Sequence, residues 1–303
     1  MHPRERTLLA AKSLLLGAML AVPAASRAGE ATYPPYSLNG TQVRTFHSNR
    51  VGIDYKLYVG LPRDYDASSS SYPVVMILDA DSSFAMTHGI LRFLEDHDEL
   101  APAILVGIAY PGVAEEKRGP IYKTNRTRDY TPTTMKEGGY GAEFQKVSGG
   151  ADRFLEFIGE ELVPYLEREF RVQPHDRAIV GHSYGGLLAS YALLTRPGLF
   201  QRFVIVSPSL WWDRRLMTRI EKREAALLKS LPARAFFAVG QGETGNILGT
   251  GSAEDLEEFV GKLKSRHYSG LQSALWIAPD ETHHSVFPGA LTRGLRWVFK
   301  EKL

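Results

Sequence analysis

From about residue 73 to the end of the chain, short apolar runs alternate with helix-like segments, and this alternation restricts the fold more than any other feature. The apolar runs span residues 73–78, 103–110, 177–180, 203–206, 235–239 and 274–277. The helix-like segments span residues 88–96, 151–170, 185–194, 214–229, 253–264 and 288–300. Runs that are apolar on both faces indicate buried strands of a parallel sheet. Strands that alternate with helices predict an α/β fold, with a mostly parallel central sheet and helices on both of its faces.

Two further strands are expected ahead of this pattern, at 42–48 and 54–61, and their spacing predicts an antiparallel hairpin at the N-terminal edge of the sheet. We therefore expect a single domain over residues 42–303, preceded by a linker at 29–41. The segment at about 111–149 is polar and glycine-rich, and it has no clear periodicity. A segment of this length inside a compact domain is usually functional, so we expect a loop over the active site.

The N-terminus has the layout of a secretory signal peptide over residues 1–28. Basic residues come first, a short apolar stretch follows at 13–22, and Ser26-Arg27-Ala28 offers the small-x-small pattern of a cleavage site. The apolar stretch is too short to span a bilayer comfortably. We expect cleavage near Ala28, export to the periplasm or the exterior, and a mature form without a membrane anchor.

The composition excludes several classes of protein. The chain has no cysteine, so disulfides, thiolate metal sites, a cysteine nucleophile and a lipoprotein anchor are all excluded. It has 36 basic and 34 acidic residues, for a formal net charge of +2. This balance gives no electrostatic reason to expect a nucleic acid as a partner.

The motif Gly181-His182-Ser183-Tyr184-Gly185 is the strongest indication of chemistry. The bare Gly-x-Ser-x-Gly pattern arises by chance in roughly one chain in ten of this length. Here it directly follows a predicted strand and opens a predicted helix, which is the setting of the nucleophile in the α/β-hydrolase fold. Ser183 is therefore the predicted nucleophile, and the backbone N–H of Tyr184 is expected to face the developing oxyanion. For the second oxyanion donor we select the backbone N–H of Asp81, which follows strand 74–78.

The serine needs a base and an acid, which in this fold follow it in the order acid, histidine. His283 and His284 both follow the last predicted strand, and spacing alone does not separate them. Glu243 is the first carboxylate after strand 235–239, with Asp255 as the alternative acid. The predicted reaction is two-step acyl transfer from a small-molecule ester. It needs no metal and no organic cofactor.

At these motifs the sequence resembles an esterase family related to esterase D, which includes mycolyltransferases and trilactone siderophore esterases. The resemblance runs from about Val43 to the C-terminus, and it is closest to exported siderophore esterases. It is carried by Leu78-Asp79-Ala80-Asp81, Arg128-Asp129-Tyr130-Thr131-Pro132, the Ser183 motif, Ser207-Pro208-Ser209-Leu210-Trp211-Trp212 and Glu281-Thr282-His283-His284-Ser285-Val286-Phe287-Pro288. It implies Ser183 as nucleophile, His283 rather than His284 as base, and Glu243 as acid. It also implies that a serine–histidine dyad is sufficient in some members.

The resemblance also suggests where a substrate binds. A basic, tyrosine-containing loop at 111–149 is suited to an anionic catecholate complex, so Arg128 and Tyr130 are candidate binding residues. Trp211 and Trp212 are candidates for an aromatic pocket. The alternatives are an ion pair of Arg128 with Asp129 and core packing of one tryptophan. Two other functions stay open at this point: an exported acyltransferase, and a non-catalytic binding protein with the same fold.

Overall fold

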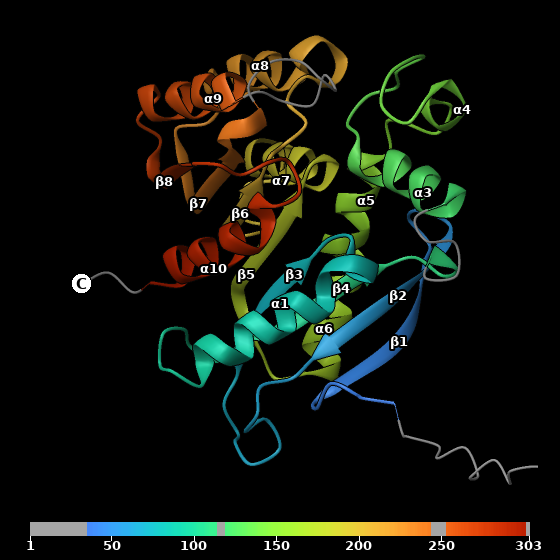
Figure 1. The fold of residues 1–303 in the computed structure, drawn as a ribbon, viewed down its shortest axis with the longest axis vertical. Coiled ribbons are helices and arrows are strands. Elements are labelled where there is room, and N and C mark those ends of the chain that lie inside the picture. Colours follow the sequence, from blue (N-terminus) through green and yellow to red (C-terminus); the bar gives the residue numbers. More distant parts are fainter. Residues whose placement is uncertain (1–34, 114–118, 244–252, 301–303) are drawn as a thin grey trace, which may run out of the picture. The chain divides into compact units, whose positions relative to one another are not determined.

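The computed structural model describes residues 35–113, 119–243 and 253–300 (Figure 1). The chain divides into two units, Met1–Ser37 and Leu38–Leu303, and the fold below is that of the second. The predicted signal peptide and residues 29–34 of the predicted linker lie outside the described residues.

A single sheet carries the domain, with strand order β1-β2-β4-β3-β5-β6-β7-β8 in the part of the chain described. Its strands are β1 (Thr41–Ser48), β2 (Ile53–Gly60), β3 (Tyr72–Ile77), β4 (Ile104–Ala109), β5 (Val172–His182), β6 (Arg202–Val206), β7 (Ser230–Gly240) and β8 (Ser269–Ala278). The pairs β1–β2 and β2–β4 are antiparallel, and every pair from β4 to β8 is parallel. The predicted mostly parallel sheet with an antiparallel N-terminal edge is therefore confirmed.

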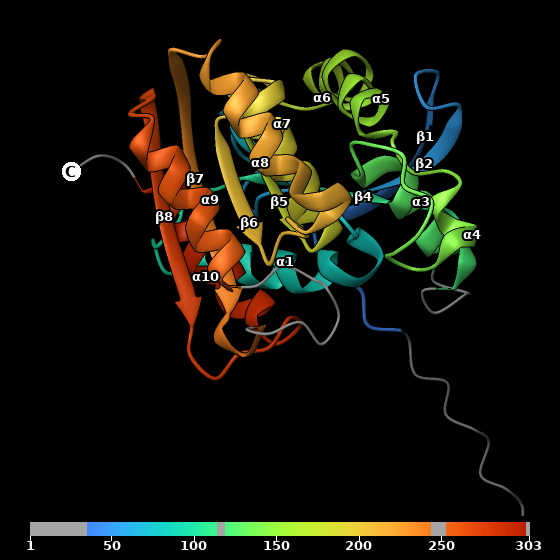
Figure 2. The same ribbon diagram turned by 90° about the horizontal axis from the view of Figure 1, so that it is seen from above.

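Helices cover both faces of this sheet (Figure 2). One face packs against α1 (Ala80–Glu95) and α10 (Val286–Phe299), through a cluster that includes Phe84, Leu91, Leu291 and Leu295. The helices of the other face are α5 (Ala151–Glu156), the π-helical turn η1 (Phe157–Leu162), α6 (Val163–Glu169), α7 (Tyr184–Thr195), α8 (Trp212–Ala225) and α9 (Ala253–Ser265). No helix among the described residues is long and apolar enough to cross a membrane.

The prediction of an irregular segment at 111–149 is wrong in part. It contains α3 (Pro120–Tyr130) and the short α4 (Ala142–Gln145). Three of the buried residues of α3 are Arg126, Thr127 and Asp129. Because this helix buries polar side chains among polar partners, it has no apolar stripe that periodicity could detect.

Candidate active site

Ser183 lies in a sharp turn between β5 and α7. Its backbone angles are φ 60° and ψ −117°, a region that residues other than glycine rarely adopt. Its N–H donates to Val206 O at 3.0 Å, which ties the turn to β6. A Cβ on Gly181 would lie 2.2 Å from Gly185 O. Glycine at position 181 is therefore required for the turn that raises the serine hydroxyl above the sheet.

His283 and Glu243 lie together beside this turn. Glu243 ends a short 3₁₀ turn, η2 (Gln241–Glu243), directly after β7, and His283 follows β8. Nδ1 of His283 is 2.8 Å from Oε2 of Glu243. The other carboxylate oxygen accepts hydrogen bonds from Ser207 Oγ at 2.6 Å and Gly240 N at 2.9 Å. With Nδ1–H donating to the carboxylate, Nε2 of His283 carries the lone pair that a general base needs.

The alternative acid and the alternative base have different surroundings from Glu243 and His283. Asp255, the alternative acid, forms an ion pair with Arg215 at 2.6 Å. His284 is exposed, and its ring meets the His283 ring edge-on, with centroids 5.1 Å apart. The structure thus brings His283 and Glu243 together and places Asp255 elsewhere.

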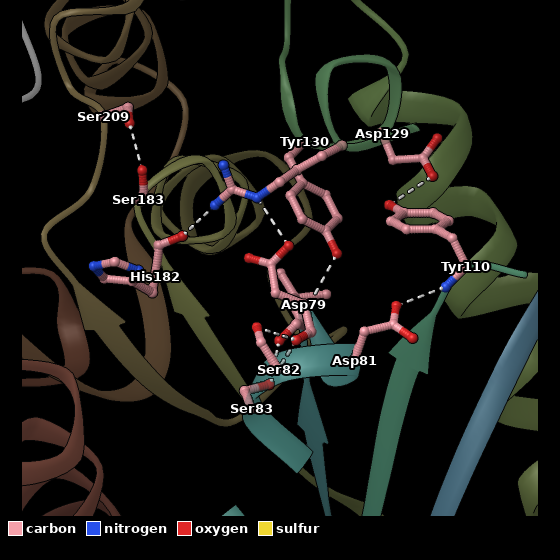
Figure 3. Close-up of polar contacts among 12 residues, drawn as sticks. Asp79, Asp81, Ser82, Ser83, Tyr110, Asp129, Tyr130, His182, Ser183 and Ser209 are labelled. Carbon is pink, nitrogen blue, oxygen red and sulfur yellow. Dashed lines mark hydrogen bonds and ion pairs between the residues drawn. The ribbon is translucent and has the colours of Figure 1, made fainter. Parts of the chain in front are cut away.

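The Ser183 hydroxyl is 3.5 Å from Ser209 Oγ (Figure 3). Within the described ranges, no hydrogen bond joins it to His283. Catalytic hydrogen bonds often tighten only when substrate binds. His182 helps to hold the predicted base, because its Nε2 donates to His283 O at 2.6 Å. Burial is the main cause that lowers the pKa of His182 well below its usual value, with the neighbouring His283 adding to it.

Three histidines in this region form a cluster of possible metal ligands. His182, His283 and His284 each offer a ligand atom, and these atoms lie within 4.8 Å of one another. However, the imidazole of His283 bonds Glu243 through one nitrogen, and that of His182 bonds a backbone carbonyl through one nitrogen. This pattern orients the His283 ring as the base of a serine hydrolase requires.

A cavity of about 510 Å³ opens at Ser183. Its wall combines the turn after β3, helix α3, the α3–α4 loop and the start of α10, and includes Leu78, Asp79, Tyr122, Lys123, Arg126, Tyr140, His284 and Phe287. The volume falls in the usual range for a small-molecule site. Apolar, aromatic and cationic groups therefore lie in the same cavity as the predicted nucleophile.

The two predicted oxyanion donors each lie in the first turn of a helix. Tyr184 is the first residue of α7, and Asp81 is the second residue of α1. Backbone N–H groups there have no partner within their own helix. The carboxylate of Asp81 is turned toward the β4 end, where it accepts a hydrogen bond from Tyr110 N at 3.2 Å (Figure 3). It also accepts a hydrogen bond from Tyr58 Oη at 3.1 Å. Burial raises the pKa of this carboxyl group.

Arg128 and Tyr130 are not in the cavity wall formed by the described residues. Arg128 donates to both oxygens of the fully buried Asp129, at 2.7 and 2.9 Å. The hydroxyls of Tyr55 and Tyr110 donate to the same carboxylate, at 2.9 and 3.0 Å. Tyr130 is also fully buried, and its Oη accepts a hydrogen bond from Asp79 N at 3.3 Å. Of the two alternatives for Arg128, the structure has the ion pair.

The two tryptophans likewise lie outside that part of the cavity wall. Trp212 is fully buried, and its Nε1 donates to Thr133 Oγ1 at 3.1 Å. Trp211 is partly buried and lies 6.1 Å from the ring of Tyr184, centroid to centroid. The arginine that does line the cavity is Arg126, which the sequence did not distinguish from its neighbours.

Comparison with known proteins agrees with this geometry. Residues 48–264 match the family described as "Putative esterase". The ferri-bacillibactin esterase BesA of Bacillus subtilis (strain 168) is 29% identical over 90% of this chain and 94% of its own length. The siderophore enterobactin esterase of Emericella nidulans is 34% identical over 50% of each chain. The crystal structure of an IroE-like serine hydrolase from Shewanella oneidensis is 30% identical, with a TM-score of 0.75 over 86% of this chain and 80% of that chain. The chain therefore belongs to this esterase family and is a carboxylic ester hydrolase.

Proposed function

We propose that the protein is an exported serine esterase that cleaves siderophore esters through an acyl-enzyme on Ser183. The observation that carries the proposal is the Glu243–His283 hydrogen bond beside the Ser183 turn, at the carboxyl ends of β5, β7 and β8. In an α/β sheet, ligands bind outside the carboxyl ends of the strands.

In the first step, Ser183 Oγ attacks the ester carbonyl and its proton passes to His283 Nε2. The carbonyl oxygen becomes an oxyanion, which the N–H groups of Tyr184 and Asp81 stabilise. When the tetrahedral intermediate collapses, the bond to the leaving oxygen breaks and His283 returns the proton to that oxygen. Ser183 then carries the acyl group as an ester.

In the second step, water replaces the alcohol. His283 accepts a proton from water as the hydroxide equivalent bonds to the acyl carbon, and the bond from that carbon to Ser183 Oγ breaks. The proton returns to the serine oxygen, and the carboxylic acid leaves. Glu243 orients the imidazole and stabilises its protonated form during both transfers.

The siderophore substrate is supported by the relatives and by the cavity. One of the relatives is named as a ferri-bacillibactin esterase and another as a siderophore enterobactin esterase. Lys123 brings a cation to the cavity in addition to the Arg126–Asp79 ion pair, in which the two charges balance. Tyr122, Tyr140 and Phe287 bring aromatic surface to the same wall. A cationic and aromatic wall suits an anionic aromatic ester such as a catecholate siderophore.

Hydrolysis by wild type and Ser183→Ala tests the proposal. With p-nitrophenyl esters of increasing chain length and a ferric tris-catecholate trilactone, we expect wild type to cleave both kinds of ester and the variant to cleave neither. A p-nitrophenyl phosphonate should transfer its phosphonyl group to the Ser183 oxygen of wild type only, with release of p-nitrophenol, and the mass of the protein should rise by that group. Retained hydrolysis in Ser183→Ala would contradict the assignment of Ser183 as the nucleophile, and a trilactone left intact by wild type would contradict the proposed siderophore substrate.

For export, we expect the protein in the periplasm or medium to begin just after Ala28. Recovery of full-length chain inside the cell would contradict it.

A further inference from the structure

One guanidinium joins three separate segments of the cavity wall. Arg126 in α3 is 3% exposed. Its Nε donates to Asp79 Oδ1 at 2.8 Å, its Nη1 to Tyr140 Oη at 2.7 Å, and its Nη2 to His182 O at 2.9 Å. All three nitrogens of the side chain are therefore engaged, each with a different part of the chain.

Two of these partners adjoin the predicted oxyanion donors. Asp79 begins the turn that leads into α1, two residues before Asp81, and His182 directly precedes Ser183 (Figure 3). The turn and the nucleophile helix are in close contact, since a Cβ on Gly185 would lie 3.3 Å from Leu78 Cδ1 and 3.6 Å from Asp79 Oδ2. A small displacement of either segment would therefore change the distance between the two N–H groups.

The turn at Asp79 also needs support. Its φ is 55° and ψ 39°, the left-handed region, which is uncommon for residues other than glycine. Such a conformation persists where surrounding contacts fix it. Here the contacts are the ion pair to Arg126 at the carboxylate and the hydrogen bond to Tyr130 Oη at the backbone N–H.

The guanidinium itself is held in place by aromatic rings. Its central carbon lies 5.6 Å from the ring centroids of Tyr122 and Tyr130 and 5.1 Å from that of Tyr184. Cation–π contacts of this kind strengthen when the cation is removed from water. The arginine is therefore built into the wall as a fixed group.

We infer that Arg126 is a positioning residue that sets the distance between the two oxyanion donors, by tying the Asp79 turn to the carbonyl that precedes Ser183. This inference rests on the proposed ester hydrolysis at Ser183. In this role Arg126 does not bind an anionic substrate directly. It acts through the N–H groups of Tyr184 and Asp81, which stabilise the substrate only in the transition state.

The test compares a neutral p-nitrophenyl ester with the thionoester in which sulfur replaces the carbonyl oxygen. Sulfur is a weaker hydrogen-bond acceptor than oxygen, so an enzyme with an intact oxyanion hole favours the oxygen ester over the thionoester. An enzyme whose oxyanion hole is distorted loses this preference. For Arg126→Met we expect kcat on the oxygen ester to fall about 10²-fold with KM within about threefold of wild type. The ester-to-thionoester ratio of kcat/KM should fall at least about tenfold.

Three further proteins complete the experiment. Arg153→Met removes an exposed arginine of α5 that is not in the described cavity wall, and it should keep the wild-type ratio. Arg126→Lys keeps the charge but cannot donate to all three partners, so its ester-to-thionoester ratio should lie between those of wild type and Arg126→Met. If the methionine variant does not fold, the lysine variant decides the test. In Arg126→Gly, added guanidinium ion should restore part of the lost kcat.

An Arg126→Met protein with the wild-type ratio would overturn the inference. So would a loss confined to KM for an anionic ester, which would make Arg126 a substrate-binding residue. The proposed function would still hold after either result, provided that wild type hydrolyses esters and Ser183→Ala does not. A wild-type protein that cleaves no ester would overturn the proposed function itself, and the inference with it.

Discussion

Nδ1 of His283 and Oε2 of Glu243 are 2.8 Å apart, and the second oxygen of the same carboxylate accepts two further hydrogen bonds, from Ser207 Oγ and Gly240 N. The Glu243 side chain is only 4% exposed. All of its partners among the described residues are donors, so both oxygens of the side chain must accept hydrogen bonds. That requirement distinguishes a carboxylate from an amide of the same shape.

Glu243→Gln should therefore slow catalysis although the side chain keeps its size. The amide NH₂ must face either the histidine or the two donors at the other oxygen, and both arrangements disturb the orientation of the imidazole. We expect kcat to fall roughly 10²- to 10⁴-fold with little change in KM. Steady-state hydrolysis of a p-nitrophenyl ester measures this, with Asp255→Asn as the matched acid-to-amide control. Full activity of Glu243→Gln would instead favour a serine–histidine dyad.

The residues that carry the predicted chemistry could be grouped from the sequence, because the loops that follow parallel strands lie at the same edge of the sheet. The segments that follow the predicted strands at 177–180, 235–239 and 274–277 all lie at the carboxyl edge of one parallel sheet. Ser183, Glu243 and His283 each come from one of these segments, so the order of strands was sufficient to group them. Strand order alone did not separate His283 from His284, and the family resemblance favoured His283. The structure has His283 in contact with Glu243.

Arg126 could not be selected in the same way. It lies two residues before Arg128, in a segment with several basic residues, and charge alone does not separate the two. Once the segment is a helix, two residues correspond to a rotation of about 200°. Arg126 and Arg128 therefore point to opposite sides of α3, one toward the cavity and the other toward Asp129. The helix itself escaped detection because the residues it buries are largely polar.

The position of Arg128 leads to a prediction about stability rather than binding. Asp129 is fully buried and its charge is balanced by Arg128. Arg128→Met would leave that carboxylate without its cation, and removal of one partner of a buried pair typically costs about 3–5 kcal/mol. We expect this loss in the free energy of unfolding, measured with urea. The KM of the folded variant for both neutral and anionic esters should stay within about twofold of wild type. A large rise in KM for the anionic ester alone would return Arg128 to the binding site.

Gly181 of the serine turn gives a second stability prediction, with a glycine of α9 as the control. A Cβ at Gly181 would lie 2.2 Å from a backbone oxygen, whereas a Cβ at Gly261 in α9 would meet nothing within 4 Å. Gly181→Ala should therefore force the turn open, and we expect the midpoint of thermal unfolding to fall and hydrolysis to be lost. Gly261→Ala should raise stability by about 0.5–1 kcal/mol, because alanine is the better helix former. Equal stabilities for the two variants would contradict the steric argument.

The pKa of His182, in the serine turn, predicts how stability depends on pH. Burial lowers the pKa of His182 well below its usual value, so the folded protein holds it neutral at a pH where the unfolded chain, with a pKa of about 6.5, is protonated. Unfolding then takes up a proton, and the contribution of His182 to stability is present above about pH 6.5 and is lost as the pH falls below it. Burial lowers the pKa of His88 as well, so His88 contributes in the same direction.

His182→Gln should separate this contribution from others, because the amide can still donate to His283 O but does not titrate. Between pH 7.5 and 5.5, we expect the midpoint of thermal unfolding to fall less in His182→Gln than in wild type, and less again when His88→Gln is added. Stability is the appropriate readout, since the titration of a catalytic base would dominate any activity profile. If the midpoint of thermal unfolding falls equally in wild type and in both variants over this pH range, protonation of His182 and His88 is not what makes the fold sensitive to acid.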